Sequence, residues 1–418
     1  MSGDQVYFWT NALRMLDGQR IYLDFFQFTP PGTNLVYLAL FEIFGPRIWV
    51  TNIAVLLLGA GFAWVCFSIS IWLMSRSSAL LASALFLVLI YGRLLNGTHH
   101  LFSMLLILCA VRVFMAGNGL NRTAAAGALL GLSAFFTHSH GLAVLAAFSV
   151  FLLWSRFCNT SSQRAFWPSW MLLVACFVVV LVLVFTPFVM TSGAERIWHS
   201  QVTYVREYMV GQHLPWLGLP EPPTLRRFYT VGQYLSVYLM LPVVYLLVFM
   251  HYARRRGAGV PERQRLVLLA LVGSTLLAEV AFTPNWLRMY AVSAPGVILL
   301  AWVAAASQWK RYAVPLLWIM VVCITLQQTW ARVRRDYEVI DLPAGRAAVL
   351  PQAQEKLQWL AQHIAPGDFF FQAGWPGLYL PLRLRNPAFL DVVETTGVTP
   401  PEYVTRAVQE LEAKNIRL

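Results

Sequence analysis

Long apolar runs, each close to the length that crosses a lipid bilayer, constrain the fold of this chain more than any other feature. Between residues 48 and 330 these runs alternate with short polar segments. Backbone groups inside the hydrocarbon cannot bond to water, so a spanning segment must be a helix or part of a closed barrel. Barrel strands would alternate apolar and polar residues. Runs such as 172–190 are continuously apolar, which predicts helices.

The length of the runs also predicts how the chain is divided. A span needs roughly 20 apolar residues, which gives about ten spans here. From Ala331 onward the composition is that of an ordinary soluble domain. The sequence therefore predicts an all-α polytopic membrane domain, 48–330, followed by a small soluble α/β domain, 331–418. The predicted spans are 48–74, 77–93, 100–117, 122–137, 141–157, 168–190, 231–252, 265–283, 286–307 and 311–330.

Charged residues in the loops orient these spans. One set of alternate loops is almost wholly basic, with Glu262 as its one acid, whereas the other set mixes basic and acidic residues. Basic residues concentrate in cytoplasmic loops, so the first set is predicted to be cytoplasmic. Residues 1–47, the loop 191–230 and the tail 331–418 then face outward from a plasma or inner membrane. With both ends outside and no leading span, we expect a further helix before Met1, unless the span count is wrong by one.

Two short helices are predicted in residues 1–47. Apolar residues recur at helical spacing from Val6 to Leu16, which predicts an amphipathic helix at the membrane interface. Pro31 and Gly45 bound a second helix, Thr33–Phe44, which is too short to span and is expected on the outer surface.

The tail is predicted to mix helices with strands. Periodicity indicates helices at Gln352–Ile364 and Pro401–Asn415, and a turn precedes a short strand at Phe369–Gln372. The chain ends at Leu418, where we expect a further strand to follow.

The placement of the charges argues against nucleic-acid binding, and the spacing of the cysteines argues against a cysteine metal site. The net charge is +12, but the basic residues lie in loops between spans, so membrane lipids rather than nucleic acid are the expected partners. The five cysteines have no metal-ligand spacing and are interpreted as small apolar residues of the core.

Short motifs in the first 45 residues follow one another in a distinctive order. They resemble the first outer loop of the C-type integral-membrane glycosyltransferases. The closest likeness is to the group that holds the protein O-mannosyltransferases and the bacterial aminoarabinose transferases of lipid A. In that family the loop follows the first span, and a soluble outer tail is also a family feature. The matching residues are Asp4-Gln5-x-Tyr7, Leu16-Asp17-Gly18-x-x-x-Tyr22-x-Asp24, Pro30-Pro31-Gly32 and Phe44-Gly45.

The resemblance implies transfer of a sugar from a polyprenyl-phosphate donor to a lipid, glycan or protein acceptor, with inversion at the anomeric carbon. It also implies that Asp4 is the catalytic base, because a positioned carboxylate can take the proton of an attacking hydroxyl. The alternative for Asp4 is a helix N-cap. Asp24 is predicted either to line the pocket that holds Asp4 or to be a solvated acid in a turn.

Two departures from the family pattern affect whether a metal ion is expected. Many members carry Glu where this chain has Gln5, and others carry an acid and a lysine where it has Phe28-Thr29. We therefore assign no cofactor, and a divalent metal stays open.

Outward-facing cations are the candidates for binding the donor phosphate. Arg288, followed by Tyr290 and Pro295, resembles the basic-aromatic entry to a span that this family uses near the carrier phosphate. The alternative is an ion pair between Arg288 and the intramembrane Glu279. Three residues of the loop 191–230 are further candidates, because arginine suits phosphate, although an interfacial loop would have a similar composition. These are Arg196, His199 and Arg226.

Histidines gather at the outer ends of predicted spans. His99-His100 and His138-x-His140 have spacings that allow a metal site, a substrate contact or an interfacial role. We assign His99, His100 and His138 to substrate contact. The resemblance favours this at residues 137–141, where family members often carry a Thr-polar-x-polar-Gly turn.

The rival class is a transporter or flippase of lipids or sugars. Such proteins commonly contain internal repeats and polar breaks at the membrane midplane. The two halves of this chain show no repeat, and its candidate polar residues lie at the outer ends of spans. Both observations favour the enzyme.

Overall fold

The computed structural model describes residues 4–157, 166–209, 239–251, 260–281, 286–393, 398–414 and 416. Within these ranges the chain is mainly helical, and five helices are long and apolar enough to cross a membrane. The predicted polytopic helical class is therefore confirmed, while the domain boundaries stay predictions. The five are α3 (Ile48–Ser70), α8 (His138–Phe157), α9 (Phe166–Ser192), α12 (Val260–Ala281) and α15 (Lys310–Val333).

The other predicted spans correspond to shorter helices. Two of them are interrupted: 77–93 contains a π-helical stretch, and 286–307 breaks into two helices before Pro295. These elements are α4 (Arg76–Leu85), η1 (Phe86–Tyr91), α5 (Gly92–Leu94), α6 (His99–Met115), α7 (Leu120–Phe136), the helix Leu239–His251, α13 (Trp286–Ala291) and α14 (Ala294–Ala306).

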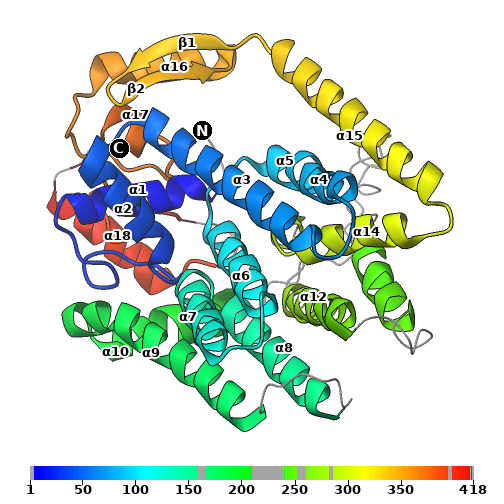
Figure 1. The fold of residues 1–418 in the computed structure, drawn as a ribbon. Coiled ribbons are helices and arrows are strands. Elements are labelled where there is room, and N and C mark those ends of the chain that lie inside the picture. The colour runs from blue at the N-terminus through cyan, green and yellow to red at the C-terminus, as the bar shows by residue number, and fades with distance from the viewer. Residues whose placement is uncertain are drawn as a thin grey trace.

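Close packing of α7 on α9 forms one part of the bundle (Figure 1). Gly127 and Gly131 lie one turn apart on α7, and a Cβ at either would collide with the carbonyl oxygen of Leu173 or Phe177 on α9. Small residues at this spacing allow helices in a membrane to approach closely. Because lipid gives no hydrophobic drive for association, this contact area stabilises the pair.

The first helix, α1 (Gln5–Leu16), is buried, although its sequence pattern suggested an exposed polar face. Its predicted place at the membrane interface stays a prediction. Four consecutive residues, Val6 to Trp9, are at most 7% exposed. One side of α1 packs on α2 (Gly32–Phe44), and another packs on α17 (Tyr379–Leu382) of the tail. A segment from the far end of the sequence thus covers a helix whose own pattern suggested an exposed face.

The tail begins with an antiparallel hairpin of β1 (Glu338–Leu342) and β2 (Gly345–Val349), in which Glu338 pairs with Val349. The sequence analysis did not predict this hairpin. The predicted tail helices are confirmed as α16 (Pro351–His363) and α18 (Pro401–Ala413). The strand predicted at Phe369–Gln372 is wrong, because Phe369 makes only an isolated bridge with Arg385.

Segments from three parts of the sequence meet beside α1. After α9 the chain continues through α10 (Ala194–Trp198), η2 (His199–Thr203) and η3 (Val205–Met209). Tyr204 donates its hydroxyl to the Val398 carbonyl at 2.8 Å, and the Phe26 amide donates to the Phe389 carbonyl at 3.0 Å. Figure 1 shows the tail elements next to α1 and α2, with both chain ends on this side.

The α7–α9 contact predicts a specific stability defect. Gly127→Leu and Gly131→Leu force a side chain against the α9 backbone, and overpacking of this kind costs about 1–3 kcal/mol. Each variant should unfold at a lower temperature in detergent. Ala125→Leu, at an exposed position of the same helix, should leave the unfolding temperature unchanged. An equal loss in all three variants would contradict the close approach.

Candidate functional site

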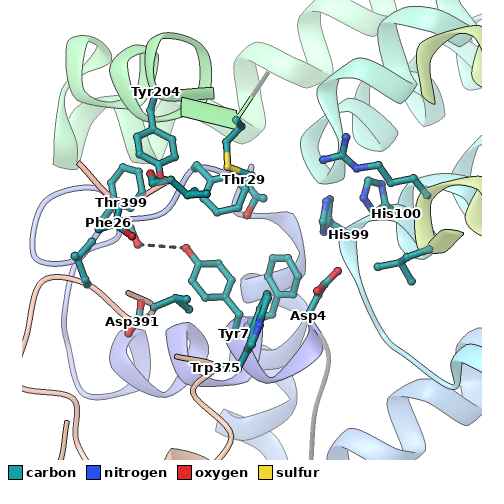
Figure 2. A pocket seen from close by; sticks show the side chains of 18 residues that line it. Asp4, Tyr7, Phe26, Thr29, His99, His100, Tyr204, Trp375, Asp391 and Thr399 are labelled. Carbon is teal, nitrogen blue, oxygen red and sulfur yellow. Dashed lines mark hydrogen bonds between the residues drawn. The ribbon is translucent and has the colours of Figure 1, made fainter. Parts of the chain in front are cut away.

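A cavity of about 220 Å³ lies where the tail meets the membrane helices. Its walls come from α1, the loop 26–29, the start of α6, the segment 204–209, α13 and the tail. Figure 2 shows two different ends: Asp4, His99 and His100 gather at one, and Phe26, Tyr204 and Thr399 at the other. The cavity therefore offers polar groups at one end and aromatic surface at the other.

Asp4 lies at the N-cap position of α1, but its side chain makes no capping hydrogen bond. The capping alternative therefore does not account for the carboxylate. Burial raises the pKa of Asp4, and the nearby positive charge of Arg288 opposes that rise. A carboxylate with a raised pKa beside a fixed cation, in a cavity, is a combination found at functional sites.

Arg288 comes to the cavity from the first turn of the short helix α13. His99 and His100 come from the first turn of α6, with ring centroids 3.9 Å apart. The ring of His99 also lies 5.2 Å from that of Phe8 on α1. Three separate elements therefore bring an acid, a guanidinium and two imidazoles into one space.

Four of the residues predicted from the sequence, Asp4, His99, His100 and Arg288, line this cavity. Their roles stay predictions.

Other predicted residues lie elsewhere in the described part of the chain. Asp24 accepts a hydrogen bond from the Arg20 amide at 2.7 Å and pairs with the Arg20 guanidinium at 3.3 Å, as a turn acid would. Tyr290 is buried in the helical core. Arg196 donates to the Ser192 carbonyl at 3.4 Å, and His199 bonds to the Tyr403 hydroxyl at 3.1 Å. Arg226 lies outside the described residues.

Further polar side chains continue from His99 and His100 into the helical bundle. The ring of His140 is 5.1 Å from that of His100, and its Nε2 lies 3.5 Å from Glu279. The structure thus gives Glu279 a partner that the sequence analysis had not considered. Several buried ring nitrogens here have no hydrogen-bond partner in the structure, including one of His138. Buried polar atoms of this kind usually bind water or a ligand.

The sequence left a divalent metal open. Among the described residues, no group of three or more His, Cys, Asp or Glu side chains is arranged to hold a metal ion.

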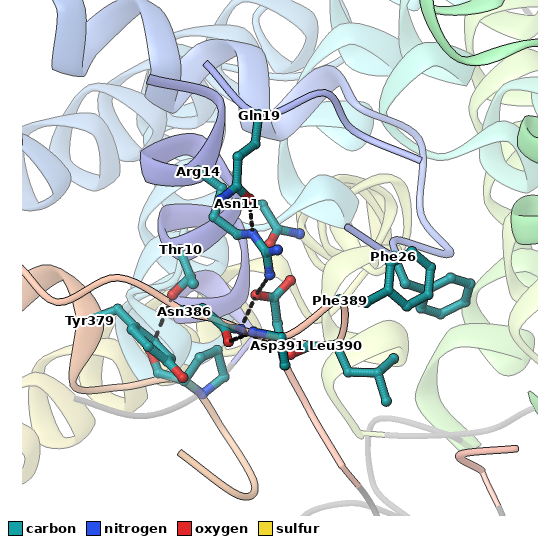
Figure 3. A network of polar contacts seen from close by, with 12 residues as sticks. Thr10, Asn11, Arg14, Gln19, Phe26, Tyr379, Asn386, Phe389, Leu390 and Asp391 are labelled. Atoms are coloured by element: carbon teal, nitrogen blue, oxygen red, sulfur yellow. Dashed lines mark hydrogen bonds and ion pairs between the residues drawn. The ribbon is translucent and has the colours of Figure 1, made fainter. Parts of the chain in front are cut away.

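The sequence analysis missed the ion pair between Arg14 of α1 and Asp391 of the tail (Figure 3). Arg14 Nη1 is 2.7 Å from Asp391 Oδ1, and the two side chains are 6% and 0% exposed. The Arg14 guanidinium also donates to Gln19 at 2.7 Å and lies over the Phe25 ring at 4.6 Å. The sequence held one sign of this pair. Asp391 stands in an otherwise apolar run from Leu390 to Val393, and an acid buried in such a run needs a partner.

Aromatic side chains form the other end of the cavity. The Phe26 ring is 4.6 Å from that of Tyr204, and Phe28 stacks on both Tyr204 and Tyr7. The Tyr7 hydroxyl donates to the Phe26 carbonyl at 3.3 Å. Flat aromatic faces of this kind are well suited to the apolar side of a sugar ring.

Comparison with known proteins bears on the fold. No protein-family model matches the chain, and no curated protein matches it. Two crystal structures of ArnT from Cupriavidus metallidurans are similar. The one bound to undecaprenyl phosphate has 13% identity and a TM-score of 0.55, and the match covers 99% of this chain and 84% of that one. The one in the apo state has 15% identity, a TM-score of 0.53 and coverages of 98% and 84%. The chain therefore has the ArnT fold, which agrees with the resemblance of the first outer loop.

The buried ion pair predicts a large loss of stability when one partner is removed. Arg14→Ala would leave the Asp391 carboxylate buried without a cation, which costs about 3–5 kcal/mol. Thermal unfolding in detergent should show the loss, and the double variant Arg14→Met/Asp391→Leu should recover much of it. Arg346→Ala breaks an exposed pair with Asp341 and should change little. A mild effect of Arg14→Ala alone would contradict this assignment.

Proposed function

We propose that this protein is a membrane glycosyltransferase that uses a polyprenyl-phosphate sugar as its donor. The observation that carries the proposal is the cavity in which Asp4 and Arg288 meet at the junction of spans and tail. The fold supports it, because ArnT, which is similar over nearly the whole chain, was crystallised with undecaprenyl phosphate. The acceptor is a hydroxyl of a lipid, glycan or protein on the outer face of the membrane.

The polar end of the cavity would bind the donor phosphate. A guanidinium can donate two hydrogen bonds to phosphate oxygens, so Arg288 is the principal candidate. Neutral histidine can donate one more, which suits His99 and His100 beside it. The same positive charge would stabilise the polyprenyl phosphate as its bond to the sugar breaks.

Asp4 would act as the general base. Its carboxylate takes the proton of the acceptor hydroxyl while the hydroxyl oxygen attacks the anomeric carbon. The bond from that carbon to the phosphate oxygen breaks, and the polyprenyl phosphate leaves with its electron pair. Attack from the face opposite the leaving group inverts the anomeric configuration. Exclusion of water from the cavity would favour transfer over hydrolysis.

Replacing the base is the direct test. Asp4→Asn keeps the shape but cannot accept the proton, so turnover should fall by about 10²- to 10⁴-fold. Purified protein in lipid nanodiscs, supplied with radiolabelled polyprenyl-phosphate sugars, would report release of polyprenyl phosphate and donor affinity separately. Donor affinity should stay close to that of the wild type.

The matched control is Asp341→Asn, an exposed acid of β1, which should keep full turnover. Equal loss of folded protein and activity in Asp4→Asn would remove Asp4 from the role. Failure of the wild type to bind any donor would favour the transporter class.

The electrostatics of Asp4 also predict a pH profile. Burial raises the Asp4 pKa and Arg288 lowers it, so Arg288→Gln should raise it further. A base works only when deprotonated, so activity is present above the folded-state pKa and is lost as pH falls through it. At saturating donor, the acid limb of kcat should therefore move to higher pH in Arg288→Gln. Arg311→Gln, at the start of α15, is the control and should keep the acid limb of the wild-type kcat–pH profile. If the acid limb does not move in Arg288→Gln, the electrostatic pairing of Asp4 with Arg288 is contradicted.

A further inference from the structure

Three arginines from three different helices gather at the end of α6 that is farther from the cavity. His99 is in the first turn of α6 and Arg112 is in its last turn, so about 20 Å of helix axis separates the two residues. Arg265 comes from near the start of α12, and Arg122 comes from the first turn of α7. This arginine cluster, Arg112, Arg122 and Arg265, is therefore distinct from the site that holds Asp4.

A single indole ring holds two of these guanidiniums. Trp72 lies in the turn between α3 and α4. Arg112 Cζ is 3.7 Å from the centroid of the Trp72 ring, and Arg265 Cζ is 4.8 Å from it. Arg265 Nη1 also donates a hydrogen bond to the Trp72 carbonyl oxygen at 3.3 Å. Because the ring face attracts cations, both guanidiniums are kept beside one another at the surface of the bundle.

The charges of the cluster repel one another. Arg122 and Arg265 each act on the Arg112 guanidinium as like charges, and Glu262 of the first turn of α12 attracts Arg265. Among the residues that the structure describes, no carboxylate forms an ion pair with any of the three arginines. The indole ring attracts two of the cations but leaves their net charge unchanged. A bound anion would offset the repulsion between them.

A ligand can reach the cluster from outside the bundle. Arg122 is exposed, and Arg112 and Arg265 are half-buried. Exposed apolar side chains flank the cluster, since Ile71 precedes Trp72 in the chain and Leu120 begins α7. The loop charges predict that these helix ends lie at the cytoplasmic face of the membrane. A ligand at this place meets guanidiniums and apolar surface together.

We propose that Arg112, Arg122 and Arg265 bind the phosphate group of an anionic phospholipid of the cytoplasmic leaflet. Guanidinium groups match phosphate oxygens in geometry and charge, and the acyl chains of a phospholipid match the exposed apolar side chains beside the cluster. Basic pockets between membrane helices on the cytoplasmic side suit anionic headgroups in general. The bound lipid would hold together the ends of α6, α7 and α12. This inference does not depend on the proposed function.

The test measures phospholipid binding to single-charge variants. Purified protein in detergent would be titrated with phosphatidylglycerol or with zwitterionic phosphatidylcholine, and native mass spectrometry would count the bound lipid. Arg112→Gln and Arg122→Gln should each weaken phosphatidylglycerol binding about fivefold and leave phosphatidylcholine binding unchanged. Arg122 is exposed, so Arg122→Gln should fold even if Arg112→Gln does not, and thermal unfolding without added lipid checks this.

Arg311→Gln is the matched control. Arg311 also lies over an aromatic ring, that of Tyr312 at 4.7 Å, and α15 begins at the same predicted face of the membrane. Because Arg311 is outside the cluster, its variant should keep the wild-type affinity for phosphatidylglycerol. An equal loss in Arg311→Gln, or no loss in Arg122→Gln, would indicate only a diffuse attraction between a basic protein and anionic lipid, and would overturn the inference.

Inorganic phosphate distinguishes a phospholipid site from a site for free anions. In the wild type, phosphatidylglycerol should raise the unfolding temperature, because a ligand of the folded state stabilises it. The same concentration of inorganic phosphate or phosphatidylcholine should leave the unfolding temperature unchanged. An equal rise with inorganic phosphate would show a free-anion site and overturn the assignment to a lipid. Donor turnover is a separate measurement, so failure of this inference would leave the proposed function standing.

Discussion

The ion pair between Arg14 and Asp391 joins the two ends of the chain, and the cavity depends on that connection. A buried charge pair contributes little net stability against an apolar alternative, but each partner is strongly required once the other is present. Arg14 is on the first helix, and Asp391 is 377 residues later. Because α1 also carries Asp4 and Tyr7, holding the tail against α1 completes one wall of the cavity. The burial of α1 follows from the same contact.

A second constraint is the membrane, which gives no water to polar groups. His140 and Glu279 are 3.5 Å apart inside the bundle, and His100 continues the cluster to the cavity. Ionisable residues at such depth are costly and usually serve a function. The proposed chemistry uses only the outer edge of this cluster. His140 and Glu279 behind it would keep His99 and His100 in a polar setting, which helps a neutral imidazole face an anionic group.

The sequence was informative where a local pattern determines structure and uninformative where distant segments meet. Continuous apolar runs predicted the spanning helices, and the loop motifs predicted a fold that agrees with that of ArnT. Periodicity placed α1 correctly along the chain but did not show that the helix is buried, because a helical pattern does not show which segment covers it. Asp391 was missed for the same reason, since its partner lies on α1. Sequence position alone did not reveal that Asp4 and Arg288 share a cavity.

The arrangement also divides the wall of the cavity between elements of different kinds. Asp4, Arg288 and the two histidines belong to α1 and to the membrane helices, which are constrained by close packing and by the membrane. Asp391 and Trp375 belong to a tail that contacts those helices through a limited set of bonds. Substitutions in the tail can therefore alter one side of the cavity without moving Asp4 and Arg288.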